Sequence, residues 1–336
     1  MQKDTSYFLI NHFFACVAGE YEYNTVIQIV WRQDLSSFFK QNNRMKTSNI
    51  LLVSIVTGLF SLTLLTLAQE SKIKSVEFKK VVENQLKISY RTSLEKICPV
   101  DSDPTAERIF KEYGAIFISS GTMLPGKCIF TSDAELQNYQ VRLKSETANI
   151  GGVQIQLQKS AMEAFLNARR EAATKNLQIS PRGGSIAAKR SFQDTVRLWN
   201  SRFSPALTHW VGQRKITSKE AAAARISDIP EQVKKVLEWE KKGLFFSKDL
   251  TKSILFSVAA PGASQHNFML ALDVEQFANK DVRKILAENG WFQTVKSDMP
   301  HFTYLGARES ELPALGLKSV NVGAQNFWIP NYADEE

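Results

Sequence analysis

The sequence predicts an α+β domain in which helices flank a small, mainly antiparallel sheet. Helical periodicity dominates residues 160–239, whereas short strand-like runs separated by turns dominate residues 253–305. The chain has 336 residues, of which 43% are hydrophobic and 23% are charged, so it is long enough to bury a sizeable core. Together these observations are typical of a globular protein in which helices come first and a sheet follows.

The helix signals are periodic apolar faces and capping residues. Apolar residues gather on one face of residues 160–174, and they recur at helical spacing in residues 192–203, at Phe192, Val196, Trp199 and Phe203. Thr217 and Glu220 have the spacing of a capping box, and Pro230 is placed to open another helix. We therefore expect helices to occupy most of the middle third of the chain.

The strand signals are shorter runs bounded by turn residues. Strands are expected at residues 115–118, 153–157, 177–179, 253–258, 291–295 and 301–305. The last three of these surround a turn at residues 260–263 and a helix at residues 279–289, with Asn279 as its cap and Gly290 at its end. This region would form the sheet.

An uncharged, mostly apolar stretch from Ser48 to Leu67 stands out near the N-terminus. Met45 and Lys46 precede it and the small residue Ala68 follows it, which is the order of a signal peptide. We therefore expect the chain beyond Ala68 to be exported. The alternative is an uncleaved membrane anchor at residues 49–67, since about 20 apolar residues can span a bilayer.

Charge and cysteine usage narrow the partners and the compartment. The net charge of +8 is dispersed, without an arginine-rich run, which argues against a nucleic-acid partner. It suits either an anionic partner, such as a cell-wall polymer or a membrane surface, or a merely solubilising surface. Cys98 and Cys128 are the cysteines beyond Ala68 and are candidates for a disulfide in an exported protein, with two unpaired buried thiols as the alternative.

Two histidines stand near acidic residues in turn-and-strand settings. Asp273 follows His266 by seven residues, an odd spacing that puts side chains on opposite faces of a regular strand. His266 is therefore expected on the irregular lip before the strand, or a bulge must bring it to Asp273. His301 opens another predicted strand, three residues after Asp298. Two imidazoles and one carboxylate form a catalytic zinc set that leaves a position for water, and Asp298 is placed to act as base.

Two stretches resemble the signatures of a known family. Residues 264–273, SQHNFMLALD, are similar to the Ser-x-His-x-x-Gly-x-Ala-x-Asp signature of the D-alanyl-D-alanine carboxypeptidase (VanY-like, M15-type) zinc peptidases. Residues 298–302, DMPHF, resemble that family's second signature, Glu-x-x-His-Phe. The two stretches have the family's order and about its separation, and the resemblance covers roughly residues 155–306.

The resemblance implies a role for each matching residue. His266, Asp273 and His301 would bind zinc, Asp298 would stand in place of the family's catalytic Glu, and Ser264 would lie near the substrate. Two departures affect this site, because Met269 replaces a Gly and Asp298 is one methylene shorter than Glu. A misplacement of about 1 Å can cost about a hundredfold in rate.

The family also places an arginine upstream, where it binds the substrate and polarises the scissile carbonyl. Arg182, in Ser180-Pro181-Arg182, is the best match because a strand-like run precedes it and a helix follows it. Arg190 is the rival. Arg182 would then join Asp298 as a catalytic residue and Ser264 as a substrate-binding residue.

The resemblance implies a zinc-dependent peptidase that hydrolyses peptide bonds in peptidoglycan stem peptides, in the periplasm or envelope of a bacterium. Carboxypeptidase and endopeptidase action both stay open, and the alternative is a non-catalytic module on the same scaffold that binds cell-wall peptide or a partner protein. The expected organisation is a doubtful extension at 1–44, a signal peptide or anchor at 45–68, a stem or accessory region at 69–150, a zinc peptidase-like domain at 151–310 and a tail at 311–336.

Overall fold

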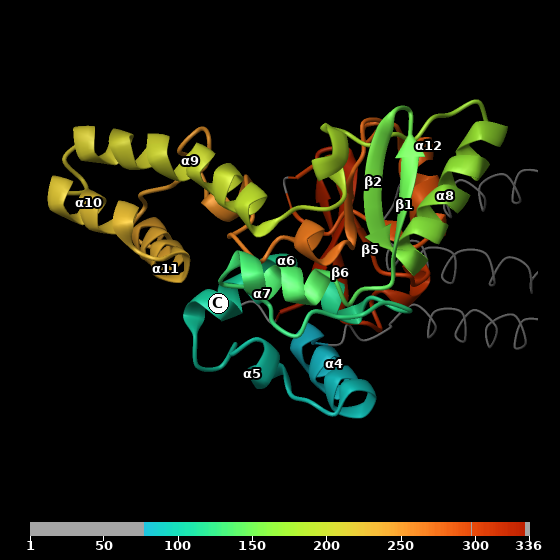
Figure 1. Cartoon of the computed structure of the whole chain (residues 1–336), viewed down its shortest axis with the longest axis horizontal. Coiled ribbons are helices and arrows are strands. Elements are labelled where there is room, and N and C mark those ends of the chain that lie inside the picture. The colour runs from blue at the N-terminus through green and yellow to red at the C-terminus, as the bar shows by residue number, and fades with distance from the viewer. Residues whose placement is uncertain (1–76, 297, 333–336) are drawn as a thin grey trace, which may run out of the picture. The chain divides into compact units, whose positions relative to one another are not determined.

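A computed structural model describes residues 77–296 and 298–332, which belong to a compact unit spanning Ile73–Glu336. The predicted extension and signal segment, residues 1–68, lie outside the described residues. Within the described residues no helix has both the length and the apolar character that crossing a membrane requires. The predicted α+β class is confirmed, because helices surround small antiparallel sheets (Figure 1).

The elements follow one another in the chain as a helical start, a hairpin, a helical middle and a sheet. The α-helices are α4 (Phe78–Gln85), α5 (Leu94–Ile97), α6 (Pro104–Tyr113), α7 (Asp133–Gln140), α8 (Lys159–Thr174), α9 (Phe192–Gly212), α10 (Ser218–Ile226), α11 (Ile229–Glu240) and α12 (Lys280–Glu288). The strands are β1 (Ser145–Ile150), β2 (Val153–Gln158), β3 (Ala271–Asp273), β4 (Trp291–Phe292), β5 (His301–Tyr304), β6 (Leu317–Val322) and β7 (Gln325–Pro330). Short helical turns are η1 (Leu86–Tyr90), η2 (Gly114–Ile118), η3 (Gly184–Ala187), η4 (Ile254–Phe256), η5 (Gln265–Phe268) and η6 (Glu309–Glu311).

The strands of the described residues form three antiparallel sheets. Two are hairpins, β1–β2 and β6–β7, and the third has the strand order β3-β5-β4. In this central sheet Asp273 of β3 is the direct partner of His301 of β5. Helices α8 and α12 pack against each other, and they contact the β1–β2 hairpin and β4 respectively. The register therefore brings together two residues that are 28 positions apart in the sequence.

Two hydrophobic clusters hold the fold. The larger cluster gathers aromatic side chains from both ends of the described chain, including Phe78, Phe110, Phe117, Phe165 and Trp291. The smaller cluster packs α9, α10 and α11 on one another and on α6, chiefly through Trp199, Phe203, Val236, Trp239 and Phe246. Phe268 and Phe302 belong to the first cluster, whereas Ala263 and Val295 belong to the second. The segments that carry the two histidines thus lie where the clusters meet.

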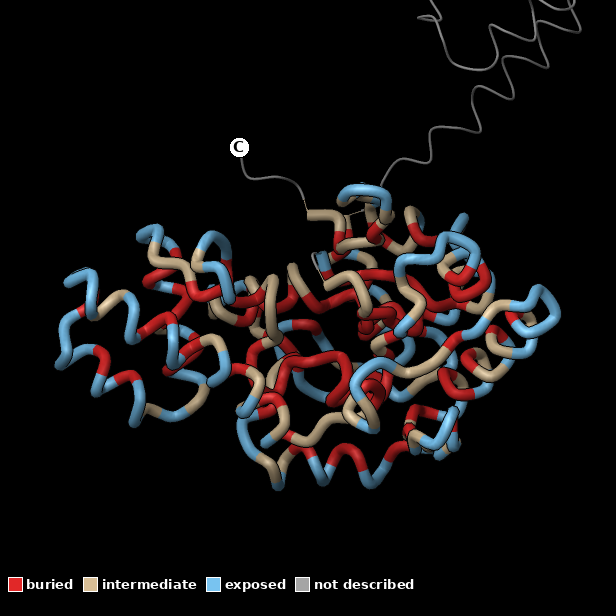
Figure 2. Tube along the Cα trace, turned by 90° about the horizontal axis from the view of Figure 1, so that it is seen from above, coloured by how far each residue is buried: buried red, intermediate tan, exposed pale blue. Residues whose placement is uncertain are grey.

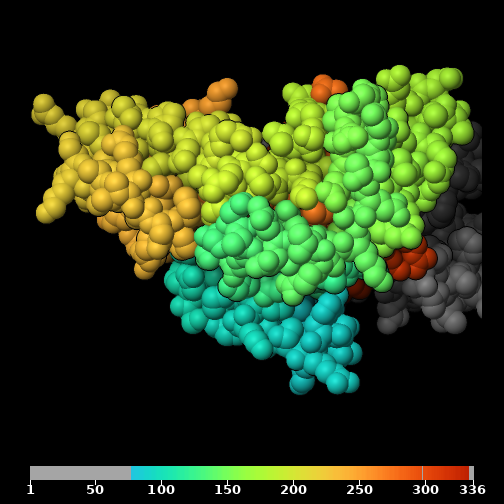
Figure 3. All heavy atoms as spheres, in the orientation of Figure 1, coloured from blue at the N-terminus to red at the C-terminus, as the bar shows by residue number. Residues whose placement is uncertain are grey.

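Helices α9, α10 and α11 form a helical lobe whose starts match the sequence signals. Ser191 and Asp194 make a capping box at α9, and Thr217 and Glu220 make the predicted one at α10. Pro230 lies in the first turn of α11. Figure 2 shows the lobe alternating between buried and exposed positions along its length. In the space-filling view of Figure 3 the lobe lies at the left, α7 lies next to it in the middle of that face, and the β1–β2 hairpin lies farther to the right.

Three predicted strands are absent from the described structure. Residues 115–118 form the 3-10 turn η2, and η4 occupies residues 254–256 within the predicted strand 253–258. Residues 177–179 form no strand, although the neighbouring Pro181 makes one isolated bridge to Val274. The first of these runs is buried throughout, and a short apolar run without alternation does not distinguish a strand from a helical turn.

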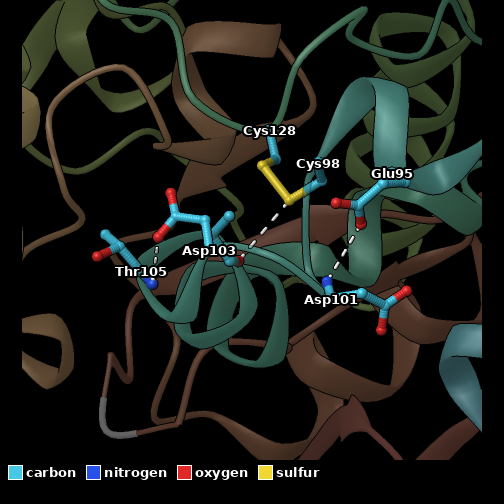
Figure 4. The surroundings of a disulfide bond; sticks show 7 residues. Glu95, Cys98, Asp101, Asp103, Thr105 and Cys128 are labelled. Atoms are coloured by element: carbon cyan, nitrogen blue, oxygen red, sulfur yellow. Dashed lines mark hydrogen bonds between the residues drawn. A yellow bond between two sulfur atoms is a disulfide. The ribbon is translucent and has the colours of Figure 1, made fainter.

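The predicted disulfide between Cys98 and Cys128 is confirmed, with an S–S distance of 2.08 Å (Figure 4). It joins the end of α5 to the segment before Phe130, whose N–H donates to the Gly262 carbonyl at 3.0 Å. Gly262 has a φ of +79°, and a Cβ there would lie 1.8 Å from the Phe130 carbonyl oxygen, so only glycine fits. The disulfide-bonded segment therefore supports the loop that leads into His266.

The C-terminal residues of the described chain form a hairpin rather than an irregular segment. Strands β6 and β7 lie within the predicted tail 311–336, and the Trp328 N–H donates to the Gln293 carbonyl at 2.8 Å. Phe78, Phe165 and Leu317 belong to one hydrophobic cluster although they come from three predicted regions. The domain boundaries at 150 and 310 stay a prediction.

Candidate metal centre

The irregular turn η5 and the ends of two paired strands position the three predicted ligands. His266 lies on η5, Asp273 ends β3 and His301 begins β5. This matches the expectation that His266 precedes the strand and Asp273 lies in it. Met269, which follows η5, has a left-handed backbone with a φ of 55°, a conformation that costs a non-glycine residue roughly 1–2 kcal/mol. Met269 thus adopts a conformation that favours glycine, the residue type that stands at this position in the resembling signature.

Three electron-rich atoms of these residues converge. His266 Nε2 lies 3.0 Å from His301 Nδ1, and Asp273 Oδ1 lies 3.3 Å from the first and 3.5 Å from the second. In a tetrahedral zinc site with bonds of about 2.0–2.1 Å, ligand atoms are about 3.3–3.4 Å apart. The three residues form a candidate metal site, and the sides of their triangle fit a zinc ion.

The ring nitrogen of each histidine that points away from the triangle is hydrogen-bonded to a group that can only accept. His266 Nδ1 lies 3.1 Å from the Ala188 carbonyl, and His301 Nε2 lies 2.8 Å from Gln265 Oε1. The orientation of the Gln265 amide is fixed because its Nε2 donates to the Tyr113 carbonyl at 2.9 Å. Each ring therefore has its proton on the outer nitrogen and a lone pair on the inner one. Two lone pairs and a carboxylate oxygen facing one another are the chemistry of a cation site.

The Asp273 carboxylate is also held in an orientation that suits a cation site. Its Oδ2 accepts from the Arg190 guanidinium at 2.5 Å, while its buried Oδ1 has no hydrogen-bond partner. Burial acts to raise the pKa of Asp273, but a protonated His266, hydrogen bonds from His266 and His301 when they carry the proton, and the Arg190 guanidinium hold this pKa well below the ordinary value. With both rings neutral, Arg190 is the cation that keeps the carboxylate ionised. The carboxylate is therefore charged, with one oxygen directed toward the imidazoles.

His266 is neutral at physiological pH. Burial and the positive charge of Arg190 together lower the pKa of His266 to about 4, against the opposing effect of Asp273. An uncharged imidazole is the form that binds a metal. The site thus has its lone pair available without first losing a proton.

A cavity of about 190 Å³ opens beside the three ligands. Asp298 lines it, together with Arg190, Arg202 and Tyr113. Burial raises the pKa of Asp298, and the negative charge of Asp273 raises it further, whereas His301 and Arg190 act against this. A carboxyl group with a raised pKa beside a metal site is suited to take up and release a proton.

Of the other predicted site residues, Ser264 lines the cavity and Arg182 does not. Ser264 is buried, and its contact with a substrate stays a prediction. Arg182 does not line the cavity: its side chain is half exposed, pairs with Glu275 at 3.0 Å and lies over the Phe277 ring. The Arg182 N–H bonds to the Asp273 carbonyl at 2.8 Å, so Arg182 adjoins the ligand by its backbone only. Arg190, the rival, is the arginine that lines the cavity.

No pattern in the sequence predicted a role for Gln265, and Arg190 was predicted only as the alternative to Arg182 for the substrate-binding arginine. The position of Arg190 had a usable signal, because it directly precedes the Ser191 cap of α9 and is therefore fixed at a helix start. Its Nε also donates to the Ile186 carbonyl at 3.0 Å. Gln265 had no local signal, since its partners Tyr113 and His301 are distant in sequence.

No protein-family model matches the chain, and no curated protein matches it in sequence. Among solved structures, VanYB in complex with D-alanine-D-alanine is 13% identical over 51% of this chain and 83% of its own, with a TM-score of 0.30. A zinc-bound mutant of the vancomycin-resistance D,D-pentapeptidase VanY is 14% identical over 49% and 82%, with a TM-score of 0.28. The LD-carboxypeptidase LdcB is 16% identical over 45% and 60%, with a TM-score of 0.25. These are distant similarities.

Proposed function

We propose that this chain is a zinc-dependent peptidase that hydrolyses peptide bonds in peptidoglycan stem peptides. The observation that supports zinc is the triangle of His266 Nε2, Asp273 Oδ1 and His301 Nδ1, in which no atom has a proton to offer the others. The observation that supports hydrolysis is a cavity beside this triangle with a buried carboxyl group, that of Asp298. The choice of substrate rests on the two signature-like stretches at residues 264–273 and 298–302.

Zinc at this site would supply a Lewis acid and a water molecule whose pKa lies near neutrality. The Asp298 carboxylate would take a proton from the attacking water and give it to the leaving amine. Arg190, rather than Arg182, would orient Asp273 and present its remaining N–H groups to the oxygen that gains charge. Gln265 and the Ala188 carbonyl would keep both imidazoles in the binding tautomer. Ser264 would contact the peptide.

The proposed location is the bacterial envelope, outside the cytoplasm. The Cys98–Cys128 disulfide supports it, because disulfides persist in oxidising compartments and are rare in the cytosol. Cleavage near Ala68 and a membrane anchor at residues 49–67 stay alternative predictions, since both fall outside the described residues.

Digestion of purified muropeptides by the zinc-loaded protein, followed by mass spectrometry, tests the proposal. The mass lost from each muropeptide identifies the bond and separates carboxypeptidase from endopeptidase action. Stoichiometric zinc without any cleavage would favour the alternative, a non-catalytic module that binds cell-wall peptide. Absence of both zinc and cleavage would contradict the proposal.

A further inference from the structure

The cavity beside the metal centre is lined by two arginines with different surroundings. Arg190 is paired with the carboxylate of Asp273. Arg202, from α9, takes part in none of the ion pairs found among the described residues. Its Nε donates to Ser257 Oγ at 2.8 Å, and its Nη1 donates to Ser201 Oγ at 2.9 Å. These neutral hydroxyls hold the guanidinium in place without neutralising its charge.

The wall that carries Arg202 is one face of α9. Thr195, Leu198 and Arg202 line the cavity at positions i, i+3 and i+7, and the helix rises about 10 Å between the first and the last of them. The other walls combine apolar surface, from residues such as Val258, Ala259 and Val295, with the polar side chains of the metal centre. A ligand with small apolar side chains and a negative group would match this lining.

Arg202 is half-buried. Burying a cation without an anionic partner costs free energy, because the loss of its hydration is not compensated. The planar guanidinium fork matches a carboxylate, and such charge-assisted pairs are about twice as strong as neutral hydrogen bonds. We propose that Arg202 binds a carboxylate of the peptide substrate and thereby determines specificity. This inference rests on the proposed function, since it takes the cavity as the substrate site. The carboxylate is either the C-terminal one or that of an acidic residue within the peptide.

Calorimetric titration of the full, zinc-loaded chain carrying Asp298→Asn tests this without turnover. The probe is the pentapeptide L-Ala-γ-D-Glu-L-Lys-D-Ala-D-Ala, compared with its C-terminal carboxamide and with the form in which the glutamate α-carboxylate is amidated. Neutralising the carboxylate that Arg202 binds should weaken binding about tenfold to a hundredfold, and neutralising the other should have little effect. Adding Arg202→Gln should abolish this discrimination, and Arg202→Lys should retain part of it.

Arg197 is the matched control. It lies on the same helix but about 140° around it, does not line the cavity, and pairs with Asp194 at 2.9 Å. Arg197→Gln should leave the discrimination between acid and amide unchanged.

Three results would overturn the assignment of Arg202: discrimination that survives Arg202→Gln, equal binding of acid and amides by the parent protein, or no binding of any of the three peptides. Failure of the proposed function gives a different result. A protein with an intact Asp298 that cleaves no muropeptide but still discriminates through Arg202 would be an anion-selective peptide-binding protein. Cleavage without discrimination would retain the peptidase and remove the role of Arg202.

Discussion

The helical lobe and the metal centre both bury polar side chains, but they satisfy them differently. In the lobe, Gln232 accepts from Trp199 Nε1 at 2.8 Å and donates to the Ala224 carbonyl at 3.0 Å. Glu240 likewise accepts from Ser253 Oγ at 2.6 Å and from the Ile254 N–H at 2.7 Å. These buried groups have their partners within the protein, so they stabilise the packing of the helices.

The metal centre, in contrast, contains a buried polar atom that has no hydrogen-bond partner. Asp273 Oδ1 is buried without a partner, and two imidazole lone pairs face it at 3.3 and 3.5 Å. A buried polar atom left unpaired costs free energy, so its presence indicates a ligand more than a structural role. The comparison teaches that burial of polar groups is not itself the mark of a functional site. The mark of this site is that an unpartnered carboxylate oxygen and two imidazole lone pairs face one another, so substitutions in the two regions should have different consequences.

The largest expected effect is that of His301→Ala. Removing one of three protein ligands should abolish stoichiometric zinc binding and reduce muropeptide cleavage to background. Metal analysis after gel filtration and mass spectrometry of digests measure both quantities. The control is His209→Ala in α9, since His209 is exposed and does not line the cavity. Unchanged zinc content in His301→Ala would mean that the metal centre is elsewhere.

Asp298→Asn should separate binding from chemistry. The amide cannot accept a proton, so cleavage should fall about 10²- to 10⁴-fold while zinc content stays stoichiometric. Rates on a fixed muropeptide and metal analysis check the two halves of this statement. Asp298→Glu is informative in either direction, because a gain shows a carboxylate that is too short and a loss shows a backbone adapted to Asp. Full activity of Asp298→Asn would remove Asp298 from the mechanism.

Gln265→Leu and Gln232→Leu compare the two regions directly. The first variant frees His301 Nε2 from its acceptor, so zinc affinity should fall about tenfold to a hundredfold. The second leaves Trp199 Nε1 without its acceptor and should cost about 1–3 kcal/mol of folding free energy with zinc affinity unchanged. Competition with a chelator and urea unfolding measure these quantities. Equal effects of both variants on zinc affinity would break the distinction between the regions.

The smallest expected effect is that of Arg182→Gln. Its pair with Glu275 is solvent-exposed, so its loss should change stability by less than about 1 kcal/mol and cleavage hardly at all. Arg190→Gln, in contrast, frees Asp273 Oδ2 and should weaken zinc binding about tenfold or more. Chelator competition on both variants decides between the two arginines. A larger loss in Arg182→Gln would restore the role that the sequence suggested for it.

The sequence predicted the parts of the fold that local chemistry determines. The capping box at Thr217, the cap at Asn279 and the amphipathic faces of α8 and α9 all involve residues within one or two turns of each other. The strand-like runs at 115–118 and 253–258 were predicted incorrectly because their conformation depends on packing against distant segments. Burial on all sides hides the alternation that identifies a strand.

For the site, the sequence singled out His266, Asp273, His301 and Asp298 through their residue types and spacing and through the resemblance of two short stretches. Their convergence depends on the register of β3 with β5, which no local pattern encodes. Gln265 and the carbonyl of Ala188 complete the site across 36 and 78 residues of sequence respectively, and Arg202 enters the cavity only because α9 runs alongside it. Such partners follow from the tertiary fold alone.

X-ray absorption spectroscopy of the zinc-loaded protein tests the central claim most directly. Ligation by His266, Asp273 and His301 predicts four-coordinate zinc with two imidazole nitrogens at about 2.0–2.1 Å and oxygen ligands at about 2.0–2.2 Å. The imidazole contribution should drop to one ring or disappear with the metal in His301→Ala. A six-coordinate oxygen environment, sulfur ligation, or a spectrum that His301→Ala leaves unchanged would contradict the account.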